Sequence, residues 1–271
     1  MRLCIITDEI SDDLDHALRV VESLGVSAAE IRILDGRNVV DHPPEVWRRV
    51  ADLLTAGGFS CPVLDSPFLK ETPVPGDPDW TGVDWAQLDR AIEAAGVLGA
   101  GTVRVFSGRR RAGADVLDWL ADVLGETAAR TRLAGLRVAV EIEHECTIGT
   151  AAEAVALVAR AGTADWGFVL DPGNESRLTG RPAQIAPVAT LAPHLRHVHV
   201  KDVDEAGAWV RVGTGLVGWP EQLAALRDCG YAGFLSMETH YATPPEGPAS
   251  ATRESVEALR LLSLGAGIDP R

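Results

Sequence analysis

The sequence predicts a single-domain (β/α)8 barrel, an α/β fold that spans residues 1–271. Short apolar runs typical of β-strands alternate eight times with amphipathic stretches typical of helices. Such alternation implies parallel strands joined by right-handed crossover helices. Dividing the chain length by eight gives about 34 residues per unit, the usual spacing of this kind of barrel. We see no internal repeat, low-complexity tract or long linker that would separate two domains.

The predicted strands are short runs rich in valine, isoleucine and leucine, bounded by polar residues or glycine. Their alternate side chains should point toward the barrel axis and toward the surrounding helices. In chain order the eight predicted strands are Arg2–Thr7, Ala28–Ile33, Phe59–Leu64, Thr102–Phe106, Leu136–Glu143, Trp166–Asp171, Leu195–Lys201 and Gly233–Glu238.

The clearest helix is expected over Leu14–Leu24, where leucine and valine recur at the spacing of one helical face. We expect Ser11–Asp12 to cap its start and Gly25 to cap its end. The same periodicity predicts helices over Val155–Ala161 and Val256–Leu264.

A doubly wound open sheet is the alternative fold. That fold normally carries a glycine-rich turn after its first strand, but this position reads Thr7–Asp8–Glu9. Neither GxGxxG nor GxxxxGK[ST] occurs in the chain, so nothing indicates a nucleotide-binding loop. The longest irregular segment is Glu71–Asp84, which is rich in proline and is a candidate lid.

Charge and composition exclude several classes of partner. Lys and Arg number 25 and Asp and Glu number 39, which gives a net charge of −14 and disfavours nucleic acid and anionic membranes. No apolar run approaches the length of a membrane span, and the N-terminus lacks the basic start of a signal peptide. The four cysteines are far apart and are expected to be reduced thiols, so we expect a soluble, cytoplasmic protein.

Polar residues end four consecutive predicted strands, the fifth to the eighth. These residues are Glu141, Asp171, His199 and Glu238, and the C-terminal strand ends are where barrels carry their active sites. Three carboxylates gathered there would repel one another and lose hydration, and a divalent cation removes both penalties. We therefore predict one bound divalent metal ion, with Mn²⁺ favoured and Mg²⁺, Co²⁺ or Zn²⁺ as alternatives. The competing interpretation is that each residue forms only a local salt bridge.

The fifth predicted strand offers two candidate metal ligands, Glu141 and Glu143. Both side chains should point toward the barrel axis, because they are two residues apart on one strand. Glu141 also fits the spacing from Gly135, so we favour it as the ligand. Glu143 lies nearer the mouth and is the candidate for contact with the substrate or with a ligand.

The same residues lie in a set of motifs that resembles the sugar phosphate isomerase/epimerase superfamily, with its xylose isomerase-like TIM barrel. The resemblance covers nearly the whole chain, and its specificity comes from the order of motifs that are weak individually. The motifs are LGVSAAEIR with Glu30 and Arg32, AVEIEHECTIGT, LDPGN, HVHVKD, the turn Gly213–Thr214–Gly215, and SMETHY.

The resemblance implies specific roles for residues that match the family's motifs. It implies Glu141, Asp171, His199 and Glu238 as metal ligands, and the two glutamates among them as the catalytic acid/base pair. Many members carry histidine at the position of Asn174, and a neutral amide cannot transfer a proton. Substrate contacts are implied near Glu143, His144, Asn174, Lys201 and His240.

Two further basic residues are candidates for substrate contact. Arg104 points inward on the fourth strand, and Lys70 follows the third strand at the same end of the barrel. The alternative for Arg104 is a salt bridge with Glu143, and the alternative for Lys201 is one with Asp202.

The resemblance implies an enzyme of carbohydrate metabolism, a metal-dependent isomerase or epimerase of a small sugar, keto sugar or polyol. Family chemistry removes a proton next to a carbonyl and forms a metal-stabilised enediolate. The alternative on the same site is a dehydratase or lyase acting on a keto-polyol or cyclic acid. The family's DNA-repair branch is disfavoured by the net charge of −14 and by only seven histidines. A non-catalytic sugar-binding barrel, a phosphate on the substrate and a homo-oligomer all remain open.

Overall fold

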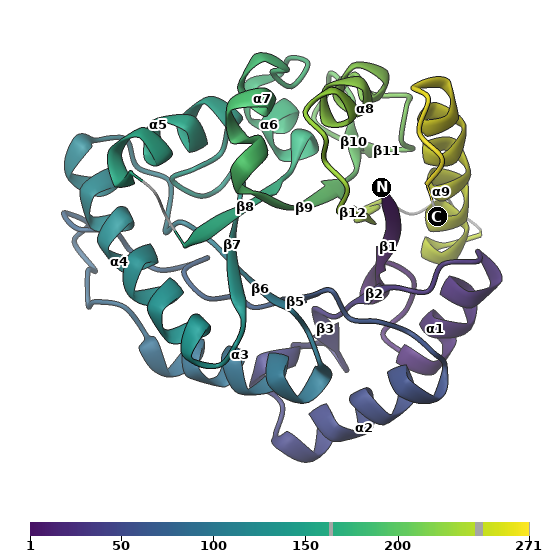
Figure 1. The fold of residues 1–271 in the computed structure, drawn as a ribbon, viewed down its shortest axis with the longest axis horizontal. Helices are drawn as coiled ribbons and strands as arrows, with labels where there is room; N and C mark the ends of the chain where they lie inside the picture. Colours follow the sequence, from purple (N-terminus) through teal and green to yellow (C-terminus); the bar gives the residue numbers. More distant parts are fainter. Residues whose placement is uncertain (163–164, 242–245, 271) are drawn as a thin grey trace.

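The computed structural model describes residues 1–162, 165–241 and 246–270, and in these residues eight parallel strands form a ring (Figure 1). Their hydrogen-bonded order follows the chain around the ring, with β1 placed between β2 and β12. The strands are β1 (Arg2–Ile6), β2 (Ala29–Glu30), β5 (Val63–Asp65), β6 (Thr102–Val105), β7 (Arg137–Glu141), β8 (Trp166–Leu170), β9 (Leu195–Val200) and β12 (Phe234–Met237).

Isolated contacts, not a continuous ladder, close the ring between β2 and β5. Ala28 bridges to Ser60, and Ile31 bridges to Leu64, both in parallel orientation. The Asp65 amide donates to the Ile31 carbonyl oxygen at 3.0 Å. The predicted barrel is therefore confirmed. Its strands are joined by ladders everywhere in the described ring except between β2 and β5, where isolated bridges join them.

Two predicted strands were wrong in length. Phe59–Leu64 was predicted as continuous, but β5 begins only at Val63, after Pro62, which has no N–H to donate to a ladder. Within Ala28–Ile33 only two residues belong to β2, and the chain then turns into a short antiparallel hairpin of β3 (Ile33–Leu34) and β4 (Arg37–Asn38).

The later strands end one or two residues before their predicted ends. Asp171, Lys201 and Glu238 each come directly after the last residue of a strand, and Glu143 lies two residues beyond β7. Their backbone has left the ladder, so their side chains project from the C-terminal rim of the barrel.

Helices surround the ring on its outside (Figure 1). The described helices are α1 (Leu14–Ser23), α2 (Pro44–Ala56), α3 (Trp85–Leu98), α4 (Ala114–Leu133), α5 (Ala151–Ala161), α6 (Pro172–Thr179), α7 (Ala186–Leu191), α8 (Trp219–Asp228) and α9 (Pro248–Gly265). Short 3-10 turns are η1 (Thr7–Glu9), η2 (Val39–Asp41) and η3 (Ala192–His194).

The start of α1 differs from its prediction. The cap is Asp13, whose side chain accepts from the His16 amide at 3.1 Å, and neither Ser11 nor Asp12 fills that position. Leu24 ends the helix, and Gly25 follows with φ +67°, a conformation that glycine adopts without strain. The other two predicted segments lie within α5 and α9.

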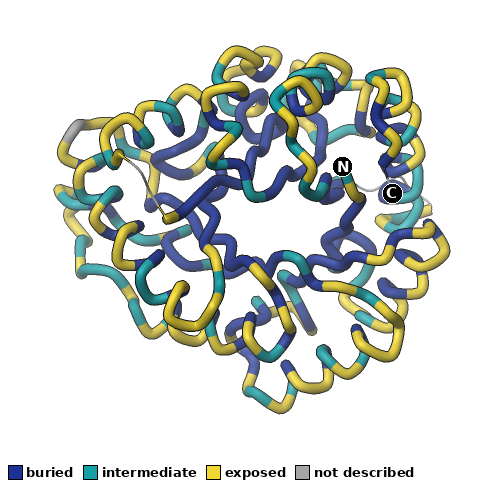
Figure 2. Tube along the Cα trace, viewed as in Figure 1, coloured by how far each residue is buried: buried dark blue, intermediate teal, exposed yellow. Residues whose placement is uncertain are grey.

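The apolar core lies between the strands and the helices, and the exposed surface lies on the outer helix faces (Figure 2). Trp47 of α2, Trp166 of β8 and Trp219 of α8 are among the largest buried side chains. The Trp219 indole N–H donates to the Lys201 carbonyl oxygen at 3.0 Å, which satisfies its polar atom. This bond also fixes the end of β9, where Lys201 begins the rim.

The segment Glu71–Asp84 does not cover the strand ends. Trp80 packs edge-on against Trp119 of α4, with ring centroids 5.4 Å apart, and Asp79 pairs with Arg109 at 2.6 Å. None of the described residues of this segment lines the cavity at the rim, so its position does not support the predicted lid. Among the described helices, none is long and apolar enough to cross a membrane.

Candidate functional site

Four side chains from consecutive barrel strands meet inside the C-terminal rim. Glu141 is the last residue of β7, Asp171 follows β8, His199 lies in β9 and Glu238 follows β12. Each is at most 3% exposed. One potential ligand atom from each lies within 4.8 Å of those of the other three. We call these four residues the rim cluster.

The imidazole nitrogen His199 Nδ1 is the centre of the rim cluster. It lies 3.2 Å from Glu238 Oε2, 3.5 Å from Glu141 Oε1 and 3.8 Å from Asp171 Oδ2. Neighbouring ligands of one ion with bonds of about 2.1 Å lie about 3–3.5 Å apart. His199 Nδ1 has no hydrogen-bond partner among the described residues, although leaving a buried polar atom unpaired is costly. Three carboxylates and one unpaired imidazole nitrogen form a donor set that fits a divalent cation.

Glu143 lies outside the rim cluster. Its Oε2 is 3.1 Å from Lys70 Nζ, and its Oε1 is 2.5 Å from His144 Nδ1. Burial raises the pKa of Glu143, but His144, Lys201 and Lys70 outweigh it and hold that pKa well below its usual value. Of the two glutamates that the sequence left open, only Glu141 faces His199 Nδ1.

Lys201 is a buried cation within hydrogen-bond distance of the rim cluster. Its Nζ lies 2.7 Å from Asp171 Oδ2 and 2.6 Å from Glu238 Oε2. Burial lowers the pKa of Lys201, but Asp171 and Glu238 outweigh it and raise that pKa well above its usual value, so the side chain is an ammonium. The alternative considered for Lys201, a salt bridge with Asp202, is not what the structure shows, because Asp202 accepts from four backbone amides instead.

Asn174 orients two members of the rim cluster. Asp171 caps α6 by accepting from the Asn174 amide at 2.8 Å, which brings the Asn174 side chain back to the strand ends. Asn174 Nδ2 then lies 3.2 Å from Glu141 Oε1 and 3.0 Å from Asp171 Oδ2, and Oδ1 lies 3.1 Å from His144 Nδ1. An amide in this place donates to two carboxylates without titrating.

The start of α6 approaches Lys201 so closely that only glycine fits. A Cβ on Gly173 would lie 2.5 Å from Lys201 Cγ. This close approach holds the buried methylene chain of Lys201 against the N-terminus of α6, where Asp171 is the capping residue.

Arg104 neutralises Glu141 from the neighbouring strand. Its Nε lies 3.1 Å from Glu141 Oε2 and 3.0 Å from Asp65 Oδ1, and the side chain is 4% exposed. Burial raises the pKa of Glu141, but Arg104 and His199 outweigh it and lower that pKa below its usual value. The alternative considered for Arg104, a salt bridge with Glu143, is not what the structure shows, because Arg104 lies opposite Ala139 in the ladder and its guanidinium reaches only as far as Glu141.

Arg32 and His240 hold the opposite oxygen of Glu238. Arg32 Nη1 lies 2.5 Å and His240 Nε2 lies 3.1 Å from Glu238 Oε1, and both cations also contact Glu9. His240 has φ +56°, a conformation that costs a non-glycine residue about 1–2 kcal/mol and turns this residue back over the rim. Partial burial lowers the pKa of His240, but Glu238 outweighs it and raises that pKa to about 9.

A cavity of about 280 Å³ opens onto both glutamates of the rim cluster, and it is lined also by Lys70, Arg104 and His240. This is slightly below the roughly 300–1,000 Å³ of ordinary ligand pockets, which favours a small ligand. A larger hollow of about 770 Å³ lies on the outside between α4 and α5. We assign function to the smaller cavity because Glu141 and Glu238 line it, whereas the larger one is lined by residues of α4, the end of α5 and the start of β8.

Trp209 is a site residue that the sequence did not indicate. It lies on β11 (Trp209–Val210), which pairs antiparallel with β10 (Asp202–Val203) just beyond β9. The indole centroid is 5.3 Å from that of His240, and Lys201 Nζ lies 5.2 Å from the Trp209 ring centre. From the sequence, Arg32 was identified only as part of a motif. It lies two residues after Glu30, so in a strand both side chains point to the same face, and this pattern could have indicated Arg32 as a site residue.

The structure thus brings all the predicted site residues to one end of the barrel at different distances from His199 Nδ1. Residues in direct contact with the rim cluster are Lys201, Asn174, Arg104 and His240. His144 contacts Asn174, Glu143 contacts His144, and Lys70 contacts Glu143.

Several solved structures are similar to the chain over nearly its whole length. The IOLI protein with a binding zinc atom has a TM-score of 0.79 and 19% identity, covering 98% of this chain and 99% of that one. An L-ribulose 3-epimerase has a TM-score of 0.73 and 18% identity, covering 98% and 95%. The probable 3-DHS dehydratase AsbF from Bacillus anthracis has a TM-score of 0.74 and 13% identity, covering 96% and 98%. At these identities the likeness shows the fold.

No curated protein matches the chain significantly. A family model described as a xylose isomerase-like TIM barrel matches residues 18–262, which is most of the sequence. The chain belongs to the xylose isomerase-like TIM barrel family.

Proposed function

We propose that the protein is a divalent-metal-dependent isomerase or epimerase of a small sugar, keto sugar or polyol. The observation that supports this most is that His199 Nδ1 has no hydrogen-bond partner among the described residues and lies among three buried carboxylates, next to a small cavity. The printed names of the structural relatives, which include an epimerase and a zinc-binding protein, support the same class of chemistry.

In this proposal the rim cluster holds one divalent ion, with Mn²⁺ favoured by the three carboxylates and Mg²⁺, Co²⁺ or Zn²⁺ as alternatives. When bound, such an ion supplies the electrophilic polarisation that makes a C–H bond next to a carbonyl more acidic. The surrounding cations Lys201, Arg104 and Arg32 offset the charge of the carboxylates and hold them in fixed positions.

Glu141 and Glu238 are the proposed acid/base pair. Each has one oxygen near His199 Nδ1 and the other held by arginine, Arg104 for Glu141 and Arg32 for Glu238. They stand on β7 and after β12, which β8 and β9 separate in the ring, so they approach the cavity from different sides. One glutamate enters the step ionised and takes the proton from the carbon next to the carbonyl. The other enters as the carboxylic acid and returns its proton to that carbon or to its neighbour, so the two exchange protonation states.

Polar and aromatic groups around the cavity suit a hydroxylated substrate. Lys70 and His240 offer donors, and Glu143 offers an acceptor, all within reach of the same cavity. The Trp209 indole, with its centroid 5.3 Å from that of His240, adds an aromatic group beside this cavity-lining residue. These residues are the proposed substrate contacts, together with His144, Asn174, Lys201 and Arg104.

The test is proton exchange in heavy water. Apoprotein reconstituted with Mn²⁺ is incubated with a panel of ketoses, aldoses and cyclic keto-polyols, and deuterium beside the carbonyl is measured by NMR. We expect exchange with at least one compound, its loss in Glu141→Gln and Glu238→Gln, and its retention in Glu145→Gln, an exposed neighbour. A folded, reconstituted protein that exchanges no proton in any compound contradicts the proposal.

One observation favours a dehydratase as the second candidate. His240 lines the cavity beside Glu238, and its pKa of about 9 makes it an imidazolium at neutral pH. After a glutamate removes the C–H proton, His240 can give its proton to a β-hydroxyl as that C–O bond breaks, releasing water. Mass spectrometry of the products distinguishes the two candidates, because only dehydration lowers the mass by one water.

A further inference from the structure

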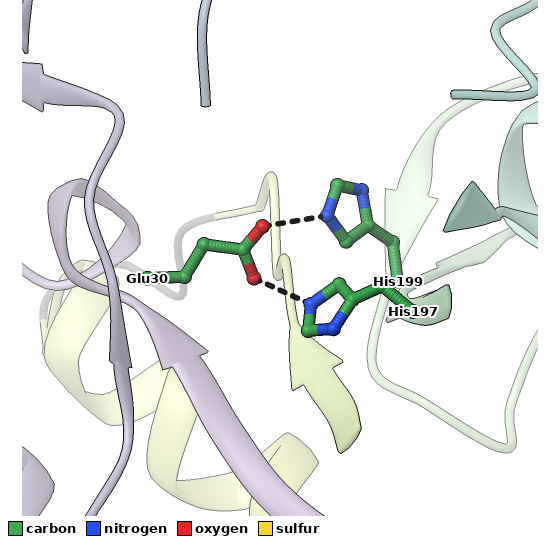
Figure 3. A group of neighbouring side chains, drawn as sticks. All are labelled: Glu30, His197 and His199. Atoms are coloured by element: carbon green, nitrogen blue, oxygen red, sulfur yellow. Dashed lines mark hydrogen bonds and ion pairs between the residues drawn. The ribbon is translucent and has the colours of Figure 1, made fainter. Parts of the chain in front are cut away.

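Behind the rim cluster, one carboxylate joins two imidazoles. Glu30 is the last residue of β2, and its Oε1 lies 3.1 Å from His199 Nε2 while its Oε2 lies 2.7 Å from His197 Nε2 (Figure 3). All three side chains have no exposed surface. The hydroxyl of Ser236 donates to Glu30 Oε2 as a third partner.

This arrangement fixes where the ring hydrogens lie. An ionised carboxylate accepts hydrogen bonds and donates none, so each imidazole that it contacts must carry a hydrogen on Nε2. His197 and Ser236 both engage Oε2, which leaves Oε1 directed at His199. Nε2 of His199 is therefore the donor, and Nδ1 on the far side of the same ring faces the three carboxylates of the rim cluster.

The same three residues are also close enough to be considered as ligands of an ion of their own. Their geometry favours hydrogen bonding, because 2.7 Å and 3.1 Å between nitrogen and oxygen are ordinary hydrogen-bond lengths. His197 Nδ1 has no partner among the described residues, and no carboxylate is placed against it as three are against His199 Nδ1. The cluster thus supports His199 and does not form a second centre.

We propose that Glu30 is the positioning residue of the metal centre: it holds His199 with its hydrogen on Nε2, so that Nδ1 is left to bind the ion. This inference rests on the metal site of the proposed function. Glu30 acts only through His199, since it lies behind that ring and does not line the cavity. A carboxylate behind a metal-bound imidazole fixes the ring and raises its basicity, and its loss typically weakens metal affinity about 10–100-fold.

Glu30→Gln tests the role with little change of shape. The amide has one acceptor oxygen and one donor nitrogen, so it cannot accept from both imidazoles. We expect the affinity of the apoprotein for Mn²⁺, measured by calorimetry, to fall about 10–100-fold. Gln222→Met in α8 is the matched control, because it removes a buried hydrogen bond to the Ala183 carbonyl oxygen and involves neither Glu30 nor the rim cluster. We expect this control to lose stability and to retain its Mn²⁺ affinity.

Two outcomes separate this inference from the proposed function. If wild type and a folded Glu30→Gln variant bind Mn²⁺ equally, the role of Glu30 is overturned and the proposed function stands. If the wild-type protein binds no divalent ion, the proposed function is overturned and this role of Glu30 with it.

A measurement on the unmodified apoprotein keeps the inference testable if Glu30→Gln does not fold. The ¹⁵N chemical shifts of the histidine rings distinguish a protonated from an unprotonated nitrogen. We expect His199 Nε2 to be protonated and its N–H to exchange slowly with solvent, because both it and Glu30 are fully buried. An unprotonated Nε2 at His199 overturns the inference.

Discussion

The ammonium of Lys201 lies 2.6 Å from Glu238 Oε2, and both side chains are buried. The same ammonium lies 2.7 Å from Asp171 Oδ2, so one lysine offsets two of the three carboxylates in the rim cluster. Removing one partner of a buried ion pair typically costs about 3–5 kcal/mol, because the remaining charge stays buried. The contact therefore links the stability of the barrel rim to the charge balance of the proposed metal site.

Lys201→Met should lower the melting temperature of the apoprotein, because Asp171 and Glu238 lose their cation. A divalent ion in the rim cluster would replace that charge, so Mn²⁺ should stabilise this variant more than it stabilises wild type. Thermal melts with and without Mn²⁺ measure both effects. If Mn²⁺ raised the melting temperatures of the two proteins equally, Lys201 and the ion would not be offsetting the same carboxylates.

Gly173→Ala should destabilise the fold by about 1–3 kcal/mol, because the added Cβ would overlap the stem of Lys201. Gly125→Ala in α4 is the control, since no atom of the described residues lies within 4 Å of its added Cβ. The control should gain up to about 1 kcal/mol from better helix propensity. Urea unfolding measures both, and a neutral Gly173→Ala would show that α6 and Lys201 shift apart at little cost.

Arg104→Met should cost about 3–5 kcal/mol, because it leaves Asp65 and Glu141 buried without their cation. Arg132→Met on the exposed face of α4 is the control, and its long contact with Asp165 should contribute little. Denaturant unfolding compares the two. Similar midpoints for both variants would contradict the buried charge network.

Trp209→Ala should raise KM more than it lowers kcat for whichever substrate the exchange screen identifies. The ring contacts His240 and Lys201 at the rim but offers no group that transfers a proton. Trp80→Ala is the control, because Trp80 packs edge-on against Trp119 of α4 and not against His240 and Lys201 at the rim. A loss confined to kcat would assign Trp209 to the chemical step instead.

Local patterns in the sequence were sufficient to predict the barrel and the residues at its rim. Strand and helix periods are local, and the two-residue parity put Glu141 and His199 on the inner face. Pairings across the ring were not predictable in the same way. Arg104 contacts Glu141 instead of Glu143, and Lys201 contacts Glu238 instead of Asp202. These choices depend on the register of strands and on where each strand ends, which no local pattern encodes.

Long-range placement also explains what the sequence did not indicate. Glu30 reaches His199 across a separation of 169 residues, and only closure of the ring brings the two together. Trp209 reaches the rim because the chain after β9 folds back as the β10–β11 hairpin. No periodicity in the preceding segment indicates that turn toward the site.

The most direct test of the account is the metal content of the purified protein, measured by elemental mass spectrometry after dialysis against Mn²⁺ and then against buffer. The account predicts about one ion per chain in wild type, and loss of that ion in Glu238→Ala, which removes one of the four proposed ligands. Wild-type protein without a bound ion after exposure to Mn²⁺, Co²⁺, Zn²⁺ and Mg²⁺ in turn would contradict it, as would equal metal content in the variant.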